Sequence, residues 1–294
     1  MRYTRSVNRE SQASRWNWLV AASVAGVLAW LATLNHTDPD TWWHLKTGEI
    51  IWKTQTIPSV DDYSYVIRGR EWITFEWLAQ LLYYGVHSAG GPMLLSAFNS
   101  LIVVVSFLAL LPLSGIAAAP VFIYGALTSR WAFHTRPHVF DGLILAAFLR
   151  LIDKSGERPS RSLWIWLPAL TALWANLHGG AAVVGPGVVG LRALSELITQ
   201  RDAAAQRRAW RWLLLSFACG AAIMVNPHGW KLFPHLLGQI SFPARHLISE
   251  WNPPAADLHI MAFFAIGAAA VVARLRKDSF LSLVVAVFGA AALS

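Results

Sequence analysis

The sequence predicts an all-α protein that crosses a membrane about nine times and forms one transmembrane domain over residues 1–294. Of its 294 residues, 55% are apolar and only 14% are charged, whereas an average soluble domain carries about 25% charged residues. The apolar residues occur in repeated runs, most of them near the ~20 residues that cross a bilayer. This composition excludes a disordered chain, and the single Cys219 excludes a disulfide scaffold.

The apolar runs follow one another along the whole chain. The first, 16–34, comes after a segment with four Arg and one Glu, and it is too long for a cleaved signal peptide. It therefore predicts an uncleaved first span with the N-terminus in the cytoplasm. Further runs cover about 92–112, 115–132, 138–152, 163–178, 180–199, 212–226, 258–273 and 280–294. The last run ends at Ser294 after only 15 residues, which leaves open that the chain is a piece of a longer protein.

One further apolar stretch, Glu76–Ala89, is too short to span. If it stays on the outer surface, the basic segments 153–162, 201–211 and 274–278 all fall inside, as the positive-inside rule requires. We therefore predict an interfacial helix here, and two substantial extracytoplasmic segments, 35–91 and 226–257.

This topology also explains the net charge of +8. The inner side holds 16 of the 24 Lys and Arg residues but only 6 of the 16 Asp and Glu residues. The basic side then faces the membrane lipid of the inner leaflet, and no nucleic-acid partner is needed. All ten His residues fall on the outer side. Because His transfers protons and contacts phosphate, we expect the chemistry on that side.

The first outer segment opens with two acids, in the order Asp38-Pro39-Asp40, followed by Thr41-Trp42-Trp43-His44. One interpretation makes Asp40 the side-chain cap of a helix from Thr41 to about Thr54, with Asp38 solvated and the tryptophans at the membrane interface. The other interpretation gives the acids a role in chemistry. The sequence pattern alone is compatible with both.

The same run, with Gly48, Pro58, Asp61-Asp62-Tyr-Ser, Trp72 and Glu76-Trp-Leu after it, resembles the first outer loop of bacterial glycosyltransferases of the GT-C superfamily. That superfamily includes the catalytic subunit of oligosaccharyltransferase, protein O-mannosyltransferases and aminoarabinose transferases of lipid A. The resemblance covers residues 1 to about 260. It implies a GT-C-like bundle with juxtamembrane helices in the first outer loop, placed in the bacterial inner or plasma membrane.

The resemblance also implies a function, which is inverting transfer of a sugar from a polyprenyl-phosphate-linked donor to an extracytoplasmic acceptor. Asp40 is similar to the essential acid of the superfamily, a general base or an orienting acceptor for the nucleophile, and Asp38 is the second catalytic candidate. For the donor phosphate we predict Arg136, His138, His178 and Arg245. For the sugar and acceptor we predict Trp43, His44, Glu76, Asn176, Glu250 and Trp251.

A metal requirement stays open. Asp38, Asp40 and Asp141 are the candidate oxygen ligands for Mg²⁺ or Mn²⁺. However, Arg136-Pro137-His138 stands where many relatives carry Arg-Pro-Asp, which weighs against a two-carboxylate metal site. The sequence has no glycine-rich nucleotide motif and no G-x-S-x-G element, in agreement with a lipid-linked donor.

Two other classes of function remain. A transporter or flippase for a lipid-linked sugar is the first, although such proteins carry ionisable residues or broken helices at mid-membrane depth. Here the acids and histidines gather at the outer ends of the predicted spans. The second is a non-catalytic fragment or assembly partner, an interpretation that the short last run favours.

Overall fold

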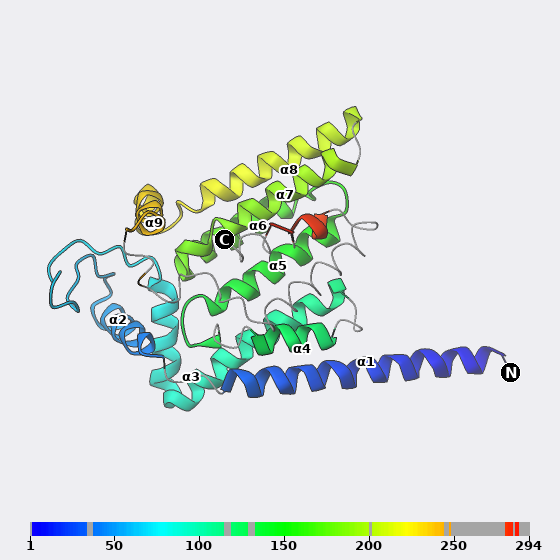
Figure 1. Ribbon diagram of the computed structural model, residues 1–294, viewed down its shortest axis with the longest axis horizontal. Helices are drawn as coiled ribbons and strands as arrows, with labels where there is room; N and C mark the ends of the chain where they lie inside the picture. Colours follow the sequence, from blue (N-terminus) through cyan, green and yellow to red (C-terminus); the bar gives the residue numbers. More distant parts are fainter. Residues whose placement is uncertain are drawn as a thin grey trace.

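The computed structural model describes residues 2–33, 38–114, 119–128, 133–199, 202–243, 247, 280–284 and 286–287, and it confirms an all-α architecture (Figure 1). Within these residues the β structure is limited to one isolated bridge between Val60 and Glu71. The helices are α1 (Arg2–Thr33), α2 (Asp40–Thr54), α3 (Trp77–Ser114), α4 (Ala119–Thr128), α5 (Val139–Ser155), α6 (Leu163–Leu177), α7 (Val184–Thr199), α8 (Ala203–Ala222) and α9 (Leu232–Ile240).

Most of the helices run side by side along the long axis of the molecule, whereas α2 and the first part of α3 lie across one end (Figure 1). We call this the α2 end. The N-terminus and the connection from α7 to α8 lie at the opposite end. Helix α9, which the sequence reasoning did not predict within 226–257, also lies at the α2 end.

Helix α3 turns a corner at two consecutive glycines. Gly90 has φ −154° and ψ 19°, and Gly91 has φ 65° and ψ −161°, so neither is helical. A positive φ costs glycine little because it has no Cβ. The corner separates 77–89 from 92–114, close to the two apolar stretches predicted there. Placement of the first half at a membrane interface stays a prediction.

Among the described residues, two stretches are long and apolar enough to cross a membrane, Trp77–Leu110 and Gly179–Thr199, and shorter apolar helices cover Trp18–Thr33 and Leu163–Leu177. This finding indicates membrane association more weakly than the nine spans that we expected. The predicted run 258–273 lies outside the described residues.

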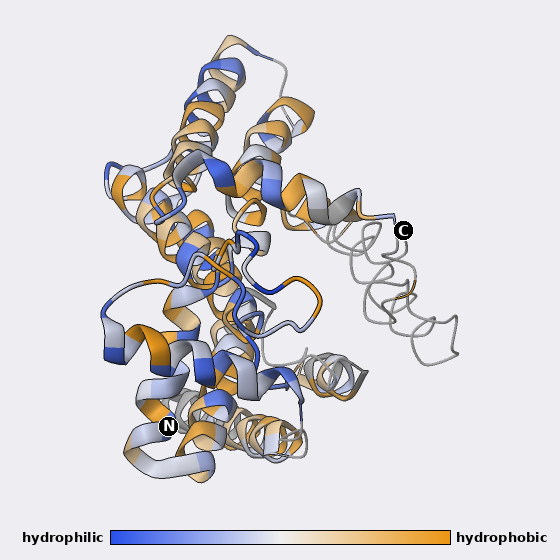
Figure 2. Ribbon diagram, turned by 90° about the vertical axis from the view of Figure 1, so that its left-hand side faces the viewer, coloured by the Kyte–Doolittle hydropathy of each residue, from blue (hydrophilic) through white to orange (hydrophobic). Residues whose placement is uncertain are grey.

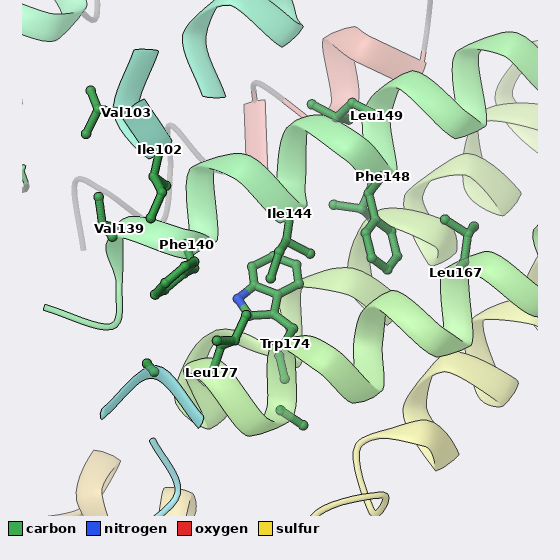
Figure 3. Packing of buried hydrophobic residues seen from close by; sticks show 14 of the residues in the cluster. Ile102, Val103, Val139, Phe140, Ile144, Phe148, Leu149, Leu167, Trp174 and Leu177 are labelled. Carbon is green, nitrogen blue, oxygen red and sulfur yellow. The ribbon is translucent and has the colours of Figure 1, made fainter. Parts of the chain in front are cut away.

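The core between α5 and α6 fixes the two helices that carry part of the site. Phe148, Leu167 and Trp174 are at most 1% exposed, and they interdigitate between these helices (Figure 3). The indole Nε1–H of Trp174 also donates a hydrogen bond to Asp141 Oδ1 at 2.7 Å. The packed core therefore holds Asp141 near the last turn of α6.

Helix α2 packs unusually close to α3 at Gly48. A Cβ atom on Gly48 would lie 2.1 Å from the backbone oxygen of Gln80 and 2.7 Å from Tyr84 Cβ. Only glycine permits this approach. This close approach also buries the preceding turn of α2. His44 in that turn is 2% exposed, and its Nδ1 lies 3.3 Å from Gln80 Nε2.

A buried ion-pair network joins α7 to α8 at the opposite end. Glu196 accepts from Arg192 and from Arg208, each at 2.6 Å, and is 7% exposed. The Arg192 guanidinium also lies 5.4 Å from the ring centroid of Trp212. Each charge in the network therefore has a partner, which is the condition for burying it without a large cost.

Candidate functional site

The start of α2 is organised by Asp38. Its side chain is buried, 3% exposed, and its Oδ1 accepts a hydrogen bond from the Asp40 backbone N–H at 2.8 Å. The helix begins at Asp40, with Pro39 as N-cap and no side-chain cap. The interpretation in which Asp40 caps the helix and Asp38 is solvated is therefore wrong, because Asp38 satisfies the first N–H group instead.

One guanidinium binds both acids. Arg136 Nε lies 2.7 Å from Asp38 Oδ2, and Arg136 Nη2 lies 2.9 Å from Asp40 Oδ2. His134 Nδ1 adds a third contact, 2.8 Å from Asp38 Oδ2. We call Asp38, Asp40, His134 and Arg136 the Arg136 cluster. Burial acts to raise the pKa of Asp38, but hydrogen bonds from Arg136 and the Asp40 backbone, with the charges of Arg136 and His134, lower this pKa overall.

The segment that carries His134 and Arg136 is held through its backbone carbonyl groups. Asn99 donates to the Phe133 carbonyl at 2.8 Å, and Tyr83 donates its hydroxyl to the Arg136 carbonyl at 2.8 Å, both from α3. Thr41 of α2 donates to the Thr135 carbonyl at 3.3 Å. These contacts position a non-helical segment without using the side chains of His134 or Arg136.

A second group of charges surrounds Glu76, the residue before α3. Its Oε1 lies 3.8 Å from His178 Nε2, and its Oε2 lies 3.9 Å from His44 Nδ1. His178 Nδ1 is 2.7 Å from Asp141 Oδ2. We call His44, Glu76, Asp141 and His178 the Glu76 cluster. Its members come from α2, α5 and the residues flanking α3 and α6.

The ionisation of the Glu76 cluster departs from that of solvated residues. Burial raises the pKa of Glu76 to about 7. For His178, burial acts to lower the pKa, but the hydrogen bond and charge of Asp141, together with the charge of Glu76, raise it overall. Burial lowers the pKa of His44 to about 3, so His44 is neutral at pH 7.

The two clusters form one site. The rings of His138 and His178 lie with centroids 6.5 Å apart, and the charges of Asp40 and Arg136 both act on the pKa of Glu76. Figure 2 looks onto this end of the molecule, where hydrophilic segments cross the middle of the view. Residues predicted from three separate sequence motifs therefore meet at the α2 end.

An apolar groove of about 370 Å³ opens beside the Arg136 cluster. It lies between the start of α2 and the corner of α3, next to the segment that carries Arg136. Its lining consists of Thr41, Trp42, Leu45, His87, Pro92, Met93, Leu95, Ser96 and Thr135. Since Thr41 and Thr135 directly adjoin Asp40 and Arg136 in the chain, the groove ends close to the charged groups.

Two predicted substrate contacts are engaged within the protein. The half-buried Trp43 ring lies 3.9 Å from the His44 ring and 5.7 Å from that of Trp72, between centroids. Asn176 accepts from Trp77 Nε1 at 2.8 Å and donates to the Val225 carbonyl at 2.7 Å. Substrate contact by either residue stays a prediction. Arg245, Glu250 and Trp251 lie outside the described residues.

The described residues contain no group of three or more His, Cys, Asp or Glu side chains arranged to hold a metal ion. Of the candidate ligands, Asp38 is bound by Arg136 and His134. Asp141 uses one oxygen for Trp174 and the other for His178. These contacts do not fit a two-carboxylate metal site, so we derive no chemistry through a metal.

His134 is the member of the site that sequence reasoning missed. It lies two residues before Arg136, in the motif that was examined for Arg136 and His138. In a non-helical segment, residues two apart can point the same way, and here both contact the same Asp38 oxygen. The spacing was therefore a usable signal.

Comparisons with family models, with curated proteins and with solved structures find no match for this chain. The functional argument therefore rests on the geometry of the site and on the sequence from Asp38 to Glu76.

Proposed function

We propose that this chain is a membrane glycosyltransferase of the GT-C type, which transfers a sugar from a polyprenyl-phosphate-linked donor to an acceptor at the α2 end, on the extracytoplasmic side. One observation carries the proposal. A guanidinium fixed by the buried Asp38 is presented, together with the partly exposed Asp40, beside an apolar groove. A lipid phosphate offers the matching chemistry, an anion joined to an apolar chain.

The arrangement in the membrane is supported by the distribution of charge. Arg158 and Arg161 lie between α5 and α6, and Arg207 lies near the start of α8; all three are exposed. The connection from α5 to α6 and the start of α8 lie at the end opposite to α2 (Figure 1). Under the positive-inside rule that end is cytoplasmic, and α1, the second half of α3 and α4–α8 supply the spans of a GT-C-like bundle.

The proposed reaction needs stabilisation of a leaving phosphate. Arg136 would bind the phosphate oxygens, because a guanidinium pairs with phosphate through two parallel N–H groups. His138 and His178 would complete the cationic surroundings. A phosphate is a good leaving group, so a fixed cation and one proton acceptor suffice.

Asp40 would act on the acceptor. Its side chain is 41% exposed, and one oxygen is bound by Arg136. The geometry therefore favours the role of an orienting hydrogen-bond acceptor for the nucleophile, through the carboxylate oxygen that Arg136 does not bind. The first isoprene units of the donor would lie in the groove next to Thr41 and Trp42.

The test is donor consumption by the purified protein in liposomes. Polyprenyl-phosphate hexoses with a radiolabelled sugar are supplied together with an extract of cell-envelope acceptors, and release of the sugar from the lipid is measured. We expect the wild-type protein to consume at least one donor, and Asp40→Ala to reduce the rate by about 100-fold, the size of effect typical of a group that acts on the proton of the nucleophile.

Asp62→Ala is the matched control, because Asp62 is an exposed acid of the same loop with 73% side-chain exposure. It should leave the rate unchanged. Full activity in Asp40→Ala would contradict the role of Asp40. Movement of intact donor across the liposome membrane without consumption would instead support the transporter hypothesis.

A further inference from the structure

Glu76 is the carboxyl group of the site that lacks a close cationic partner. Asp38 and Asp40 share the Arg136 guanidinium at 2.7 and 2.9 Å, which occupies one oxygen of each carboxylate. The oxygens of Glu76 instead face two imidazoles at 3.8 and 3.9 Å. These distances exceed a hydrogen bond, so neither imidazole ties up the Glu76 carboxylate.

The hydrogen bonds around Glu76 assign different roles to the two imidazoles. His178 donates from Nδ1 to Asp141, which turns its Nε2 toward Glu76. Burial lowers the pKa of His44 to about 3, so His44 is neutral at pH 7, and its Nδ1 shares a hydrogen bond with Gln80 Nε2 at 3.3 Å. His178 is therefore the imidazole that can carry positive charge next to Glu76, and Asp141 keeps it there.

The charges that face Glu76 come from every element packed around it. His44 and Asp40 belong to α2, Arg136 to the segment before α5, Asp141 to α5, and His178 follows α6. Tyr83, one turn into α3, points its hydroxyl to the Arg136 carbonyl. Arg136 and His134 contact Asp38 and Asp40, whereas His178 and its partner Asp141 lie on the side of Glu76.

We propose that Glu76 is a second catalytic carboxyl group, which removes the proton from the attacking hydroxyl of the acceptor, and that His178, held by Asp141, is its positioning partner. This inference rests on the proposed function. The acceptor oxygen forms a bond to the anomeric carbon, and the bond from that carbon to the phosphate oxygen breaks. The electron pair leaves with the phosphate, and the hydroxyl proton goes to Glu76 and then to water.

The burial of Glu76 suits this role. Its side chain is 14% exposed, and burial raises its pKa to about 7. A base with a pKa near the working pH combines a large ionised fraction with good proton affinity. Because Glu76 and His178 interact, the observed titration belongs to the pair. We therefore expect the activity to rise with pH around neutrality, as this pair loses its proton.

The experiment measures kcat and KM for the donor between about pH 5.5 and 9 in the liposome assay. For the wild-type protein we expect kcat to rise with pH and to reach half of its maximum near pH 7. For Glu76→Gln we expect kcat to fall by about 100-fold or more, KM for the donor to change little, and the rise near pH 7 to disappear. Glu76→Asp should restore part of the rate.

Glu71→Gln is the matched control, because Glu71 lies in the same loop with 70% side-chain exposure; it should behave as wild type. His178→Gln separates positioning from folding. Removing its positive charge should move the rise in kcat to higher pH, since His178 lowers the pKa of Glu76. A purely structural role of His178 would lower the rate without moving the profile.

The outcomes distinguish this inference from the proposed function. Donor consumption that persists in Glu76→Gln with an unchanged pH profile overturns the role of Glu76 alone. No consumption by the wild-type protein overturns both. If Glu76→Gln does not fold, the pH profile of His178→Gln decides: a shift supports the proposal, and an unshifted profile contradicts it.

Discussion

Asp38 and Asp40 are separated by one residue, yet they meet very different surroundings. Asp38 is 3% exposed and contacts both Arg136 and His134. Asp40 has 41% side-chain exposure and shares only the far nitrogen of the same guanidinium. Asp38 thus holds the guanidinium in place, and Asp40 keeps part of its surface open to a ligand.

We expect Asp38→Asn to destabilise the protein by about 2 kcal/mol at pH 7, because the ion pairs with Arg136 and His134 lose the charge of the carboxylate. The pKa of Asp38 is lowered in the folded state, so its contribution is present above the unfolded pKa and is lost as the pH falls through the folded pKa. Chemical unfolding in detergent at pH 7 and at about pH 2, below the unfolded pKa of Asp, checks this, and the difference from wild type should shrink in acid.

Asp62→Asn serves as the comparison variant, since this exposed acid lies 3.9 Å from the equally exposed Arg68. Its stability should match that of wild type, because exposed pairs contribute little. An Asp38→Asn variant as stable as wild type at pH 7 would mean that the ion pair with Arg136 is not needed for folding.

The sequence identified both acids, Arg136, His138 and His178, but it missed His134, ranked Asp40 above Asp38 and left open whether Asp38 is solvated or takes part in the chemistry. Burial of Asp38 depends on Arg136 and His134, which arrive from a segment almost a hundred residues further along the chain. Asp141 and His178 are likewise brought together by the packing of helices and not by closeness in the sequence. Local pattern selects residue types, whereas their partners follow from how the helices pack.

At the scale of the elements, the contact of α2 with α3 determines whether the two clusters meet. The contact depends on Gly48, where a Cβ would overlap the backbone oxygen of Gln80 at 2.1 Å. A backbone atom cannot move aside as a side chain can. Any larger residue therefore shifts α2 as a whole, and with it Asp40 and His44.

We predict that Gly48→Ala lowers stability by about 1–3 kcal/mol, the usual cost of overpacking, and that it also lowers activity because His44 and Asp40 move relative to Glu76. Thermal unfolding in detergent and hydrogen exchange of the α2 amides measure the two effects. Gly85→Ala in α3 is the matched control, since its Cβ would meet nothing within 4 Å. Equal stability of the two variants would contradict the close packing.

The helices themselves were largely predictable. Apolar runs at 138–152 and 163–178 correspond to α5 and α6, and the short stretch from Glu76 corresponds to the first half of α3. Helix α9 was missed because Asn226-Pro227 and Pro253-Pro254 are turn signals, and they gave 226–257 the character of turns. The sequence did not predict α3 as one continuous element, because the residues before and after its glycine corner form two separate apolar stretches.

The whole molecule has two chemically different ends. The carboxylates and imidazoles of the two clusters gather at the α2 end, which also carries the exposed Arg68 and Arg70, whereas Arg158, Arg161 and Arg207 are exposed at the other end. The proposed function requires the α2 end to be extracytoplasmic, and this requirement can be tested without a substrate.

We predict that a membrane-impermeant maleimide added to intact cells labels Tyr65→Cys but not Arg158→Cys, which should react only after the membrane is permeabilised. Tyr65 is fully exposed in the loop after α2, and Arg158 is exposed between α5 and α6. The native Cys219 is 0% exposed, so wild-type protein provides the unlabelled background. The reverse pattern would place the α2 end in the cytoplasm.

The glycine corner of α3 makes spacing along the chain part of the site. Glu76 lies just before the first half of α3, and Gly91 ends the corner, so the turns between them set the direction in which Glu76 points. One residue inserted into this half would rotate its start by about 100° relative to the corner. The carboxylate would then leave His178 and His44 although every side chain of the cluster was still present. The length of this half helix is therefore as specific a requirement as the identity of Glu76.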